Sequence, residues 1–308
     1  MATTAPTVKD EELEQLVERL LDYKVGRYQK FDDACGGEME GFRLNIVLFG
    51  MTGSGKSALI NTIFECLEMD MRPAVTQTTG REGTKILESC DLLPNNVTVY
   101  DTRGFSDFGK TEEGELFRIL FGIERTGEEL VRGDRGAEKA ATGGVGAHKL
   151  KKPPLADQMH VILWVIKAND IRFEKGIYSD IIKFVQHKAR EQIITIITVI
   201  TFDDEIRELP NPDEKRRRLK EAAREVTGSE PRDVFLIANS TPDQEFDPAY
   251  KKEVLKMLEQ ALKCGERSIK MRQVQRESPK RSISEPQGRA EKSPVENTEE
   301  PNYKSWSG

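Results

Sequence analysis

The fold of this chain is decided by one stretch, Gly50-Met51-Thr52-Gly53-Ser54-Gly55-Lys56-Ser57, which fits the pattern G-x-x-x-x-G-K-[ST] at every fixed position. A short apolar run over residues 44–49 precedes it, and residues 58–65 can propagate a helix. A phosphate-binding loop has this setting, between a buried strand and the helix that follows it. The stretch therefore predicts a site for the phosphates of a nucleoside triphosphate.

The residue types of this loop suit a tetraanionic phosphate tail. Glycines let the backbone curl closely around the phosphates, so that several amide N–H groups point inward. The start of the following helix adds further N–H donors. Lys56 supplies a positive charge to the β- and γ-phosphates, and the Ser57 hydroxyl is placed to coordinate Mg²⁺. We expect the ligand to contact Thr52, Gly53, Ser54, Gly55, Lys56, Ser57 and Ala58.

Composition limits the class of protein. A chain of 308 residues, 37% hydrophobic and 32% charged, is typical of a soluble globular protein with solvated extensions. A net charge of -6 gives no attraction to nucleic acid. The four cysteines lack C-x-x-C spacing, which argues against a zinc site or a disulfide framework. The sequence has no signal peptide, lipidation motif or membrane-length apolar run, so we expect a cytoplasmic protein without an intrinsic membrane anchor.

The chain divides into three regions. Residues 1–42 form an extension whose amphipathic helix, from about residue 10 to 28, carries apolar residues on one face, namely Leu13, Leu16, Val17, Leu20 and Leu21. This face either packs on the nucleotide domain or binds a partner or a second copy. Residues 43–264 form the nucleotide domain, ending in a helix from about residue 248. Residues 265–308 are rich in Ser, Pro, Glu, Lys and Arg, and are expected to be disordered.

Within the domain, residues 84–93 and 97–100 predict a β-hairpin with its turn at 94–96. Three later apolar runs, at 160–166, 193–200 and 234–237, are typical of parallel strands buried on both faces. Residues 110–157 are expected to be an insertion with one helix, around 113–124, and a glycine-rich part. The fold class is therefore α/β, a three-layer P-loop NTPase fold with a mostly parallel sheet.

A second motif, D-x-x-G, ends the strand over residues 97–101. Asp101 falls at the carboxyl edge of the sheet beside the phosphate loop, where its carboxylate would hold Mg²⁺ through water. Gly104 would donate its N–H to the γ-phosphate and let the loop move when that phosphate leaves.

Carrying both motifs, residues 43–264 resemble the P-loop GTPases of the translation-factor-related (TRAFAC) class. The threonine-rich stretch 74–79, the hairpin and Asp101-Thr102-Arg103-Gly104-Phe105 are similar to septins and to immunity-associated (IMAP) GTPases. The long region before His160, with the stretch Leu155-Ala156-Asp157-Gln158-Met159-His160 that leads into the next strand, is similar to GTPase-like domains of the interferon-induced protein 44 type. The resemblance implies GTP or GDP, with Mg²⁺, as ligands.

The resemblance also implies a switch threonine that completes the coordination of Mg²⁺ and senses the γ-phosphate. Thr76, Thr78 and Thr79 are the candidates, with Thr78 and Thr79 favoured and Thr78 as the metal ligand. Which of the three acts is open, because threonines in a glycine-containing stretch are also ordinary turn formers.

Base recognition departs from the pattern of the class. Thr201-Phe202-Asp203-Asp204 takes the place of [NT]-K-x-D, so Asp204 would accept the N1–H and the exocyclic amine of guanine. Phe202 replaces the usual lysine and either stacks on the purine or belongs to the core. Asn239, in Ile237-Ala238-Asn239-Ser240, matches the short final element, whose backbone meets the base.

Hydrolysis is expected to be slow, since Phe105 follows Gly104 where a glutamine would orient the attacking water. Arg103 is either a catalytic arginine or a solvated loop charge; Arg81 or a second protomer could also supply polar help. The resemblance implies a switch that controls assembly into a homodimer or oligomer through the nucleotide domain, or binding to an unidentified effector protein. The alternatives are a nucleotide-binding scaffold without a hydrolytic cycle and an ATP-specific P-loop NTPase.

Overall fold

A computed structural model of the chain describes residues 11–31, 42–74, 87–93, 97–105, 110–123, 126, 153–241 and 246–277. The candidate switch threonines Thr76, Thr78 and Thr79, together with Arg81, lie outside the described residues. So do most of the predicted glycine-rich insertion and residues 278–308 of the predicted tail. In the part that is described, no helix combines the length and the apolar character needed to cross a membrane.

The described residues form a six-stranded sheet in the order β2-β3-β1-β4-β5-β6. The strands are β1 (Leu44–Gly50), β2 (Glu88–Leu93), β3 (Val97–Asp101), β4 (Val161–Lys167), β5 (Thr195–Thr201) and β6 (Val234–Leu236). Only β2 runs antiparallel to its neighbour β3, which confirms both the predicted hairpin and the mostly parallel sheet. Because β3 and β4 flank β1 on opposite sides, the strand order reverses at β1, where open α/β sheets bind their ligands.

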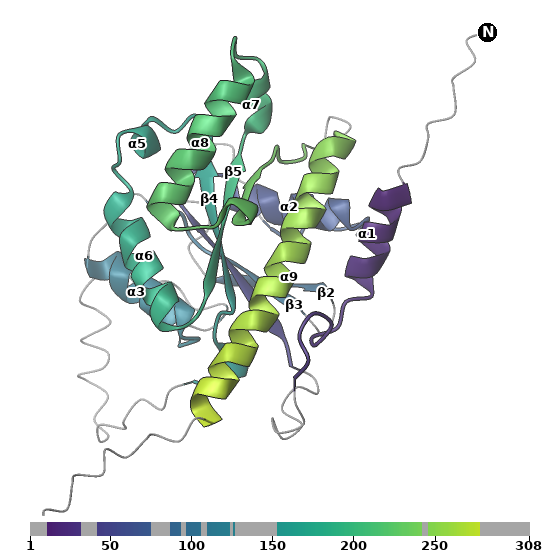
Figure 1. Cartoon of the computed structure of the whole chain (residues 1–308), viewed down its shortest axis with the longest axis vertical. Coiled ribbons are helices and arrows are strands. Elements are labelled where there is room, and N and C mark those ends of the chain that lie inside the picture. The colour runs from purple at the N-terminus through teal and green to yellow at the C-terminus, as the bar shows by residue number, and fades with distance from the viewer. Residues whose placement is uncertain are drawn as a thin grey trace, which may run out of the picture.

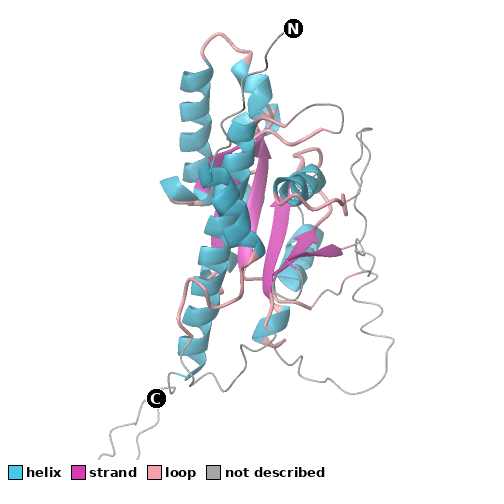
Figure 2. Cartoon of the chain, turned by 90° about the vertical axis from the view of Figure 1, so that its right-hand side faces the viewer, coloured by secondary structure: helices cyan, strands magenta, loops and turns pink. Residues whose placement is uncertain are grey.

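Helices cover both faces of the sheet, which gives the predicted three layers (Figures 1 and 2). One face carries α1 (Glu11–Leu21), α2 (Lys56–Cys66) and α9 (Pro248–Glu277), and the other carries α3 (Lys110–Leu120), α6 (Ser179–Glu191) and α8 (Pro212–Thr227). Every residue of β1 is buried, with Leu44, Ile46 and Leu48 on the first face and Val47 and Phe49 on the second. The short elements are α5 (Ile171–Glu174), α7 (Asp203–Arg207), η2 (Leu155–Asp157) and η3 (Pro231–Asp233).

The last helix is longer than the sequence predicts. It was expected to end at Cys264, but α9 runs to Glu277, so residues 265–277 belong to the folded domain rather than to a disordered tail. The physical reason is Glu266, whose buried carboxylate accepts hydrogen bonds from the Tyr23 hydroxyl at 2.8 Å and from the backbone N–H groups of Gly26, Arg27, Tyr28 and Gln29. The start and the end of the domain are thereby joined.

The N-terminal helix packs on the domain, the first of the two predicted alternatives. Leu16, Val17 and Leu20 of α1 are buried in the same core cluster as α9 residues, and Lys252 of α9 lies 2.6 Å from Glu12. Figure 1 shows α1 beside α9.

The start of the predicted insertion is also part of the fold. Helix α3 buries Leu116, Ile119 and Leu120 with α6 and the second face of the sheet. Residues 110–120 therefore form one of the covering helices, which corrects the predicted boundary at residue 110.

Candidate nucleotide-binding site

The phosphate loop connects β1 to α2 at the carboxyl edge of the sheet. Gly55 adopts a left-handed conformation, with φ of 87°, and a Cβ there would lie 2.7 Å from the side-chain nitrogen of Asn239. No side chain caps the start of α2, so its first N–H groups are left for a ligand. An uncapped helix start behind a glycine-rich loop is a site for an anion.

Lys56 is held inside this loop, only 6% exposed. Its ammonium group donates hydrogen bonds to the carbonyl oxygens of Gly50 and Met51, each at 3.2 Å. Burial lowers the pKa of Lys56 to about 8, and the carboxylate of Asp101 partly opposes this shift. Phosphate oxygens would add negative charge here and favour the protonated lysine.

Ser57 and Asp101, the two side chains that the sequence predicts as Mg²⁺ ligands, lie in contact with each other. The Ser57 hydroxyl donates to Oδ2 of Asp101 at 2.5 Å, and the buried Oδ1 of Asp101 has no hydrogen-bond partner. Burial also raises the pKa of Asp101. One hydroxyl and one carboxylate suit Mg²⁺, which takes its other ligands from phosphates and water. The described residues contain no group of three or more His, Cys, Asp or Glu that could hold a metal without a nucleotide.

The D-x-x-G element is fixed to the phosphate loop through the backbone. A Cβ on Gly104 would lie 2.4 Å from the Cα of Thr52, so only glycine allows this approach. The N–H of Thr52 donates to the carbonyl oxygen of Phe105 at 3.0 Å, and the N–H of Phe105 donates to Gly50 at 3.2 Å. The predicted γ-phosphate contact and the phosphate loop therefore lie side by side.

Phe105 itself belongs to the core. Its ring is 1% exposed and lies 6.0 Å from Phe49 and 6.3 Å from Trp164, between ring centroids. In this arrangement it cannot orient a water molecule at the site.

Arg103 is buried, at 4% exposure, rather than being a solvated loop charge. Its Nε and Nη2 donate to the carboxylate of Glu115 on α3, at 2.5–2.9 Å. The guanidinium group is thus bound to a covering helix. The predicted role as a catalytic arginine gains no support from this geometry.

Two of the residues predicted for base recognition, Thr201 and Asn239, contact the phosphate loop. The Thr201 hydroxyl donates to Ser54 O at 2.8 Å, and Nδ2 of Asn239 donates to Gly55 O at 3.2 Å. Asp204 is exposed at the start of α7. Thr201 and Asn239 therefore support the loop, while Asp204 is accessible to a base.

Phe202, in place of the motif lysine, is half-buried with a left-handed φ of 62°. The Lys167 ammonium group lies 4.2 Å from its ring centroid. One edge of the ring lies 3.5 Å from the position a Cβ on Gly55 would take. A lysine from β4 thus supplies a cation near the position where the class has one in its base motif.

Two clusters near the site were missed by sequence reasoning. Asp203 is 3% exposed and accepts hydrogen bonds from Nε and Nη2 of Arg216, each at 2.8 Å, and one from the Tyr250 hydroxyl at 2.8 Å. It fixes the base motif to α8 and α9. Each partner is distant in the chain, and no local pattern marks it.

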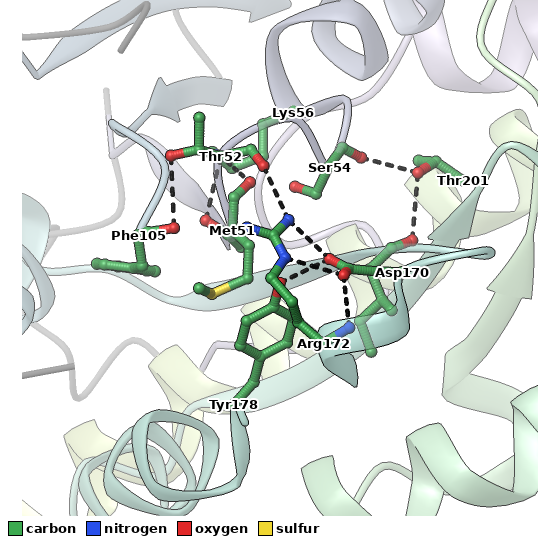
Figure 3. Close-up of polar contacts among 11 residues, drawn as sticks. Met51, Thr52, Ser54, Lys56, Phe105, Asp170, Arg172, Tyr178 and Thr201 are labelled. Atoms are coloured by element: carbon green, nitrogen blue, oxygen red, sulfur yellow. Dashed lines mark hydrogen bonds and ion pairs between the residues drawn. The ribbon is translucent and has the colours of Figure 1, made fainter. Parts of the chain in front are cut away.

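The second cluster is Asp170, Arg172 and Tyr178, which follow β4 (Figure 3). Nε and Nη2 of Arg172 donate to the carboxylate of Asp170 at 3.0 and 2.9 Å, and the Tyr178 hydroxyl donates to it at 2.7 Å. Nη2 of Arg172 also lies 3.5 Å from the carbonyl oxygen of Thr52 in the phosphate loop.

The comparison with protein families agrees with this site. The profile of the 50S ribosome-binding GTPase family matches residues 45–202, just over half of the chain. The chain belongs to this GTPase family. Its domain is therefore a GTP-binding GTPase domain, and the resemblance to the TRAFAC class is confirmed.

Individual relatives of this GTPase are distant. Cell division control protein 10 of Saccharomyces cerevisiae is 37% identical over 76 residues, which cover 22% of this chain and 24% of the yeast protein. This GTPase thus matches about a quarter of that relative's length, and the match agrees with the septin resemblance.

Solved structures show weaker likeness. Toc33 from Arabidopsis thaliana, in complex with GDP and Mg²⁺, is 13% identical with a TM-score of 0.41, covering 83% of this chain and 90% of that one. Era, in complex with MgGDPNP and a segment of 16S ribosomal RNA, is 17% identical with a TM-score of 0.35, covering 64% and 51%.

Proposed function

We propose that this GTPase binds GTP and GDP with Mg²⁺ and hydrolyses GTP slowly, as a switch for self-assembly or for binding an effector. The observation that carries the proposal is the hydrogen bond from Ser57 to Asp101, which places a hydroxyl and a carboxylate together beside Lys56 at the uncapped start of α2. A nucleotide–Mg²⁺ complex requires a hydroxyl, a carboxylate and a lysine close together, and this site provides all three.

Each part of the nucleotide has a matching part of the site. The N–H groups at the start of α2 and the ammonium group of Lys56 would bind the phosphates, and Asp204 would accept hydrogen bonds from guanine. Mg²⁺, held by Ser57 and Asp101, would neutralise charge on the β- and γ-phosphates. Gly104, packed on Thr52, would bring its N–H to the γ-phosphate.

Slow hydrolysis follows from the side chains near the γ-phosphate. Phe105 is packed between aromatic rings, and Arg103 is bound to Glu115. Neither can orient an attacking water in this arrangement, and positioning of that water is a main part of catalysis in this class.

Self-assembly is supported by apolar side chains beside the site. Ile171 and Ile177 flank Arg172 near the phosphate loop and are 62% and 60% exposed. Exposed apolar side chains next to a functional site suit a protein contact. A second copy that buried them would lie close to Arg172, which reaches the phosphate loop, and this would link assembly to the bound nucleotide.

Competition binding tests the base specificity. Wild-type protein should prefer GTP to ATP, and Asp204→Asn should lose GTP and gain xanthosine triphosphate, because the amide reverses one hydrogen bond. Asp213→Asn, at a side chain that is 95% exposed on α8, is the matched control and should leave the preference unchanged. Equal affinity of the wild type for ATP and GTP would contradict the proposal and favour an ATP-specific NTPase.

The burial of Phe105 favours one alternative, a scaffold that retains nucleotide without a hydrolytic cycle. Phosphate release over many turnovers separates the two functions, with Lys56→Ala as the inactive control. Steady release by the wild type that Lys56→Ala abolishes would exclude the scaffold. Absence of turnover, with no nucleotide-dependent change in oligomeric state by light scattering, would exclude the switch.

A further inference from the structure

We propose that Arg172 binds the γ-phosphate of GTP held in the same chain, and that it makes the site distinguish GTP from GDP. This inference rests on the proposed function. It concerns a residue outside the phosphate loop, the D-x-x-G element and the base motif.

The contacts of the loop show which end Arg172 reaches. Phe202 and Asn239 lie against Gly55, which marks the base end. Gly104, whose N–H would bind the γ-phosphate, packs on Thr52 at the opposite end. Because Nη2 of Arg172 lies 3.5 Å from the carbonyl oxygen of Thr52, the guanidinium group is at the γ-phosphate end.

Arg172 is held in place by buried partners. Asp170 is 8% exposed and accepts from Nε and Nη2 of Arg172 and from the hydroxyl of Tyr178, which is 4% exposed (Figure 3). The guanidinium carbon also lies 5.3 Å from the centroid of the Tyr178 ring. A guanidinium fixed in this way loses little conformational entropy when it binds an oxyanion. Asp170 is therefore a positioning residue.

The contact with the loop is weak enough to be exchanged. A donor–acceptor distance of 3.5 Å is beyond the usual range for an N–H···O hydrogen bond, and the Arg172 side chain is 45% exposed. A γ-phosphate oxygen would bind the guanidinium group more strongly than a neutral carbonyl does. Lys56 donates hydrogen bonds to the carbonyl oxygens of Gly50 and Met51, which precede Thr52 in the loop. The two cations would therefore approach the phosphates from different elements, Lys56 from α2 and Arg172 from α5.

The same contact would assist hydrolysis. The bond from the water oxygen to Pγ forms as the bond from Pγ to the β-phosphate oxygen breaks. GDP leaves with the electron pair of the broken bond, and the inorganic phosphate or solvent takes the proton of the water. Arg172 would neutralise negative charge on the γ-phosphoryl oxygens during this step.

The experiment measures the affinities of the full chain for GDP and for GTPγS, and single-turnover hydrolysis of GTP, in wild type and Arg172→Ala. We expect GDP affinity to stay within about twofold, and GTPγS affinity and hydrolysis to fall about 10- to 100-fold, the size of one lost charge-assisted hydrogen bond. Asp170→Asn should give a smaller loss of the same kind. Arg207→Ala is the control, because the Arg207 side chain has the same 45% exposure and likewise pairs with a carboxylate and a tyrosine ring. This variant should keep the wild-type ratio of GTPγS affinity to GDP affinity.

Three outcomes would overturn the inference. An equal loss of GDP and GTPγS affinity would mean that Arg172 only supports the loop through Thr52, and unchanged affinities for both nucleotides would mean that it does not contact the γ-phosphate. The third outcome comes from mixing Arg172→Ala with Lys56→Ala, a variant that keeps Arg172 but has an impaired phosphate site. If the mixture recovers hydrolysis, the arginine acts on the nucleotide of a second copy. If the wild type binds neither nucleotide, the proposed function fails as well.

Discussion

The hydroxyl oxygen of Ser57 and Oδ2 of Asp101 lie 2.5 Å apart, although 44 positions separate the two residues in the chain. Parallel pairing of β1 with β3 brings them together, because Leu48 of β1 stands beside Asp101 in the register. Two short motifs are thereby brought into contact at the phosphate loop.

We predict that Asp101→Asn and Ser57→Ala raise the Mg²⁺ concentration needed to retain GDP. Loss of one ligand or of its charge should weaken metal affinity about 10- to 100-fold. Titration of Mg²⁺ against the rate of GDP release measures this, and Asp91→Asn, at a half-exposed carboxylate on β2, serves as the control. A wild-type release rate that is indifferent to Mg²⁺ and to chelator would contradict the metal site.

Lys56 should make GDP binding depend on pH. Burial lowers its pKa to about 8, below the ordinary value, and bound phosphate would raise this pKa again. Between these two values binding takes up a proton, so affinity should fall up to about tenfold for each unit that the pH rises above about 8. Calorimetry at about pH 8.5 in two buffers of different ionisation enthalpy would detect the proton. Identical heats in both buffers would refute the assignment.

His160 should make the fold sensitive to acid. It is fully buried; its Nδ1 accepts from the N–H of Asn45 at 2.8 Å, and Nε2 lies 3.0 Å from the carbonyl oxygen of Leu155. Burial, and then the charge of Arg272, lower its pKa to about 3 from an ordinary 6.5. Since the unfolded chain binds the proton first, stability is complete above about pH 6.5 and falls as the pH drops toward 3.

Urea unfolding across this pH range is the measurement. His160→Gln should reduce the acid dependence, whereas His187→Gln, at an exposed position on α6, should leave it as in the wild type. Parallel stability curves for wild type and His160→Gln would show that other groups cause the acid sensitivity.

Glu266→Ala should destabilise the fold and release the N-terminal segment. Five hydrogen bonds end on this buried carboxylate, including four from consecutive backbone N–H groups of residues 26–29. Their loss should cost about 3 kcal/mol or more, since hydrogen bonds to a charged group contribute about 1.5–3 kcal/mol each and are not additive. Denaturant unfolding measures the loss, and hydrogen exchange should rise in residues 23–29.

The control is Glu259→Ala, on the same helix, whose partners Arg19 and Lys263 lie at the surface. Loss of these surface ion pairs should lower the free energy of unfolding by about 1 kcal/mol or less. Equal effects of the two substitutions would mean that Glu266 contributes no more than an ordinary surface charge.

Much of the fold could be predicted from the sequence because its signals are local. The strand that ends at Gly50 is a continuous apolar run, and the loop after it has its glycines and lysine at fixed spacing. The hairpin that ends at Asp101 follows from alternation and turn residues. The boundary at Cys264 was wrong because the partners of Glu266 lie about 240 positions away, and the polar composition after residue 264 hides the buried face of α9.

Local patterns in the amino-acid sequence are enough to predict a phosphate loop, a D-x-x-G element and a base motif, in that order, on successive strand ends of an α/β sheet. Three pairings become visible only in the folded chain: Arg103 with Glu115, Asp203 with Arg216 and Tyr250, and Arg172 with Thr52. The reason is physical. Backbone conformation and hydrophobic periodicity are set by neighbouring residues, whereas the partner of a buried charge is chosen by packing between distant segments.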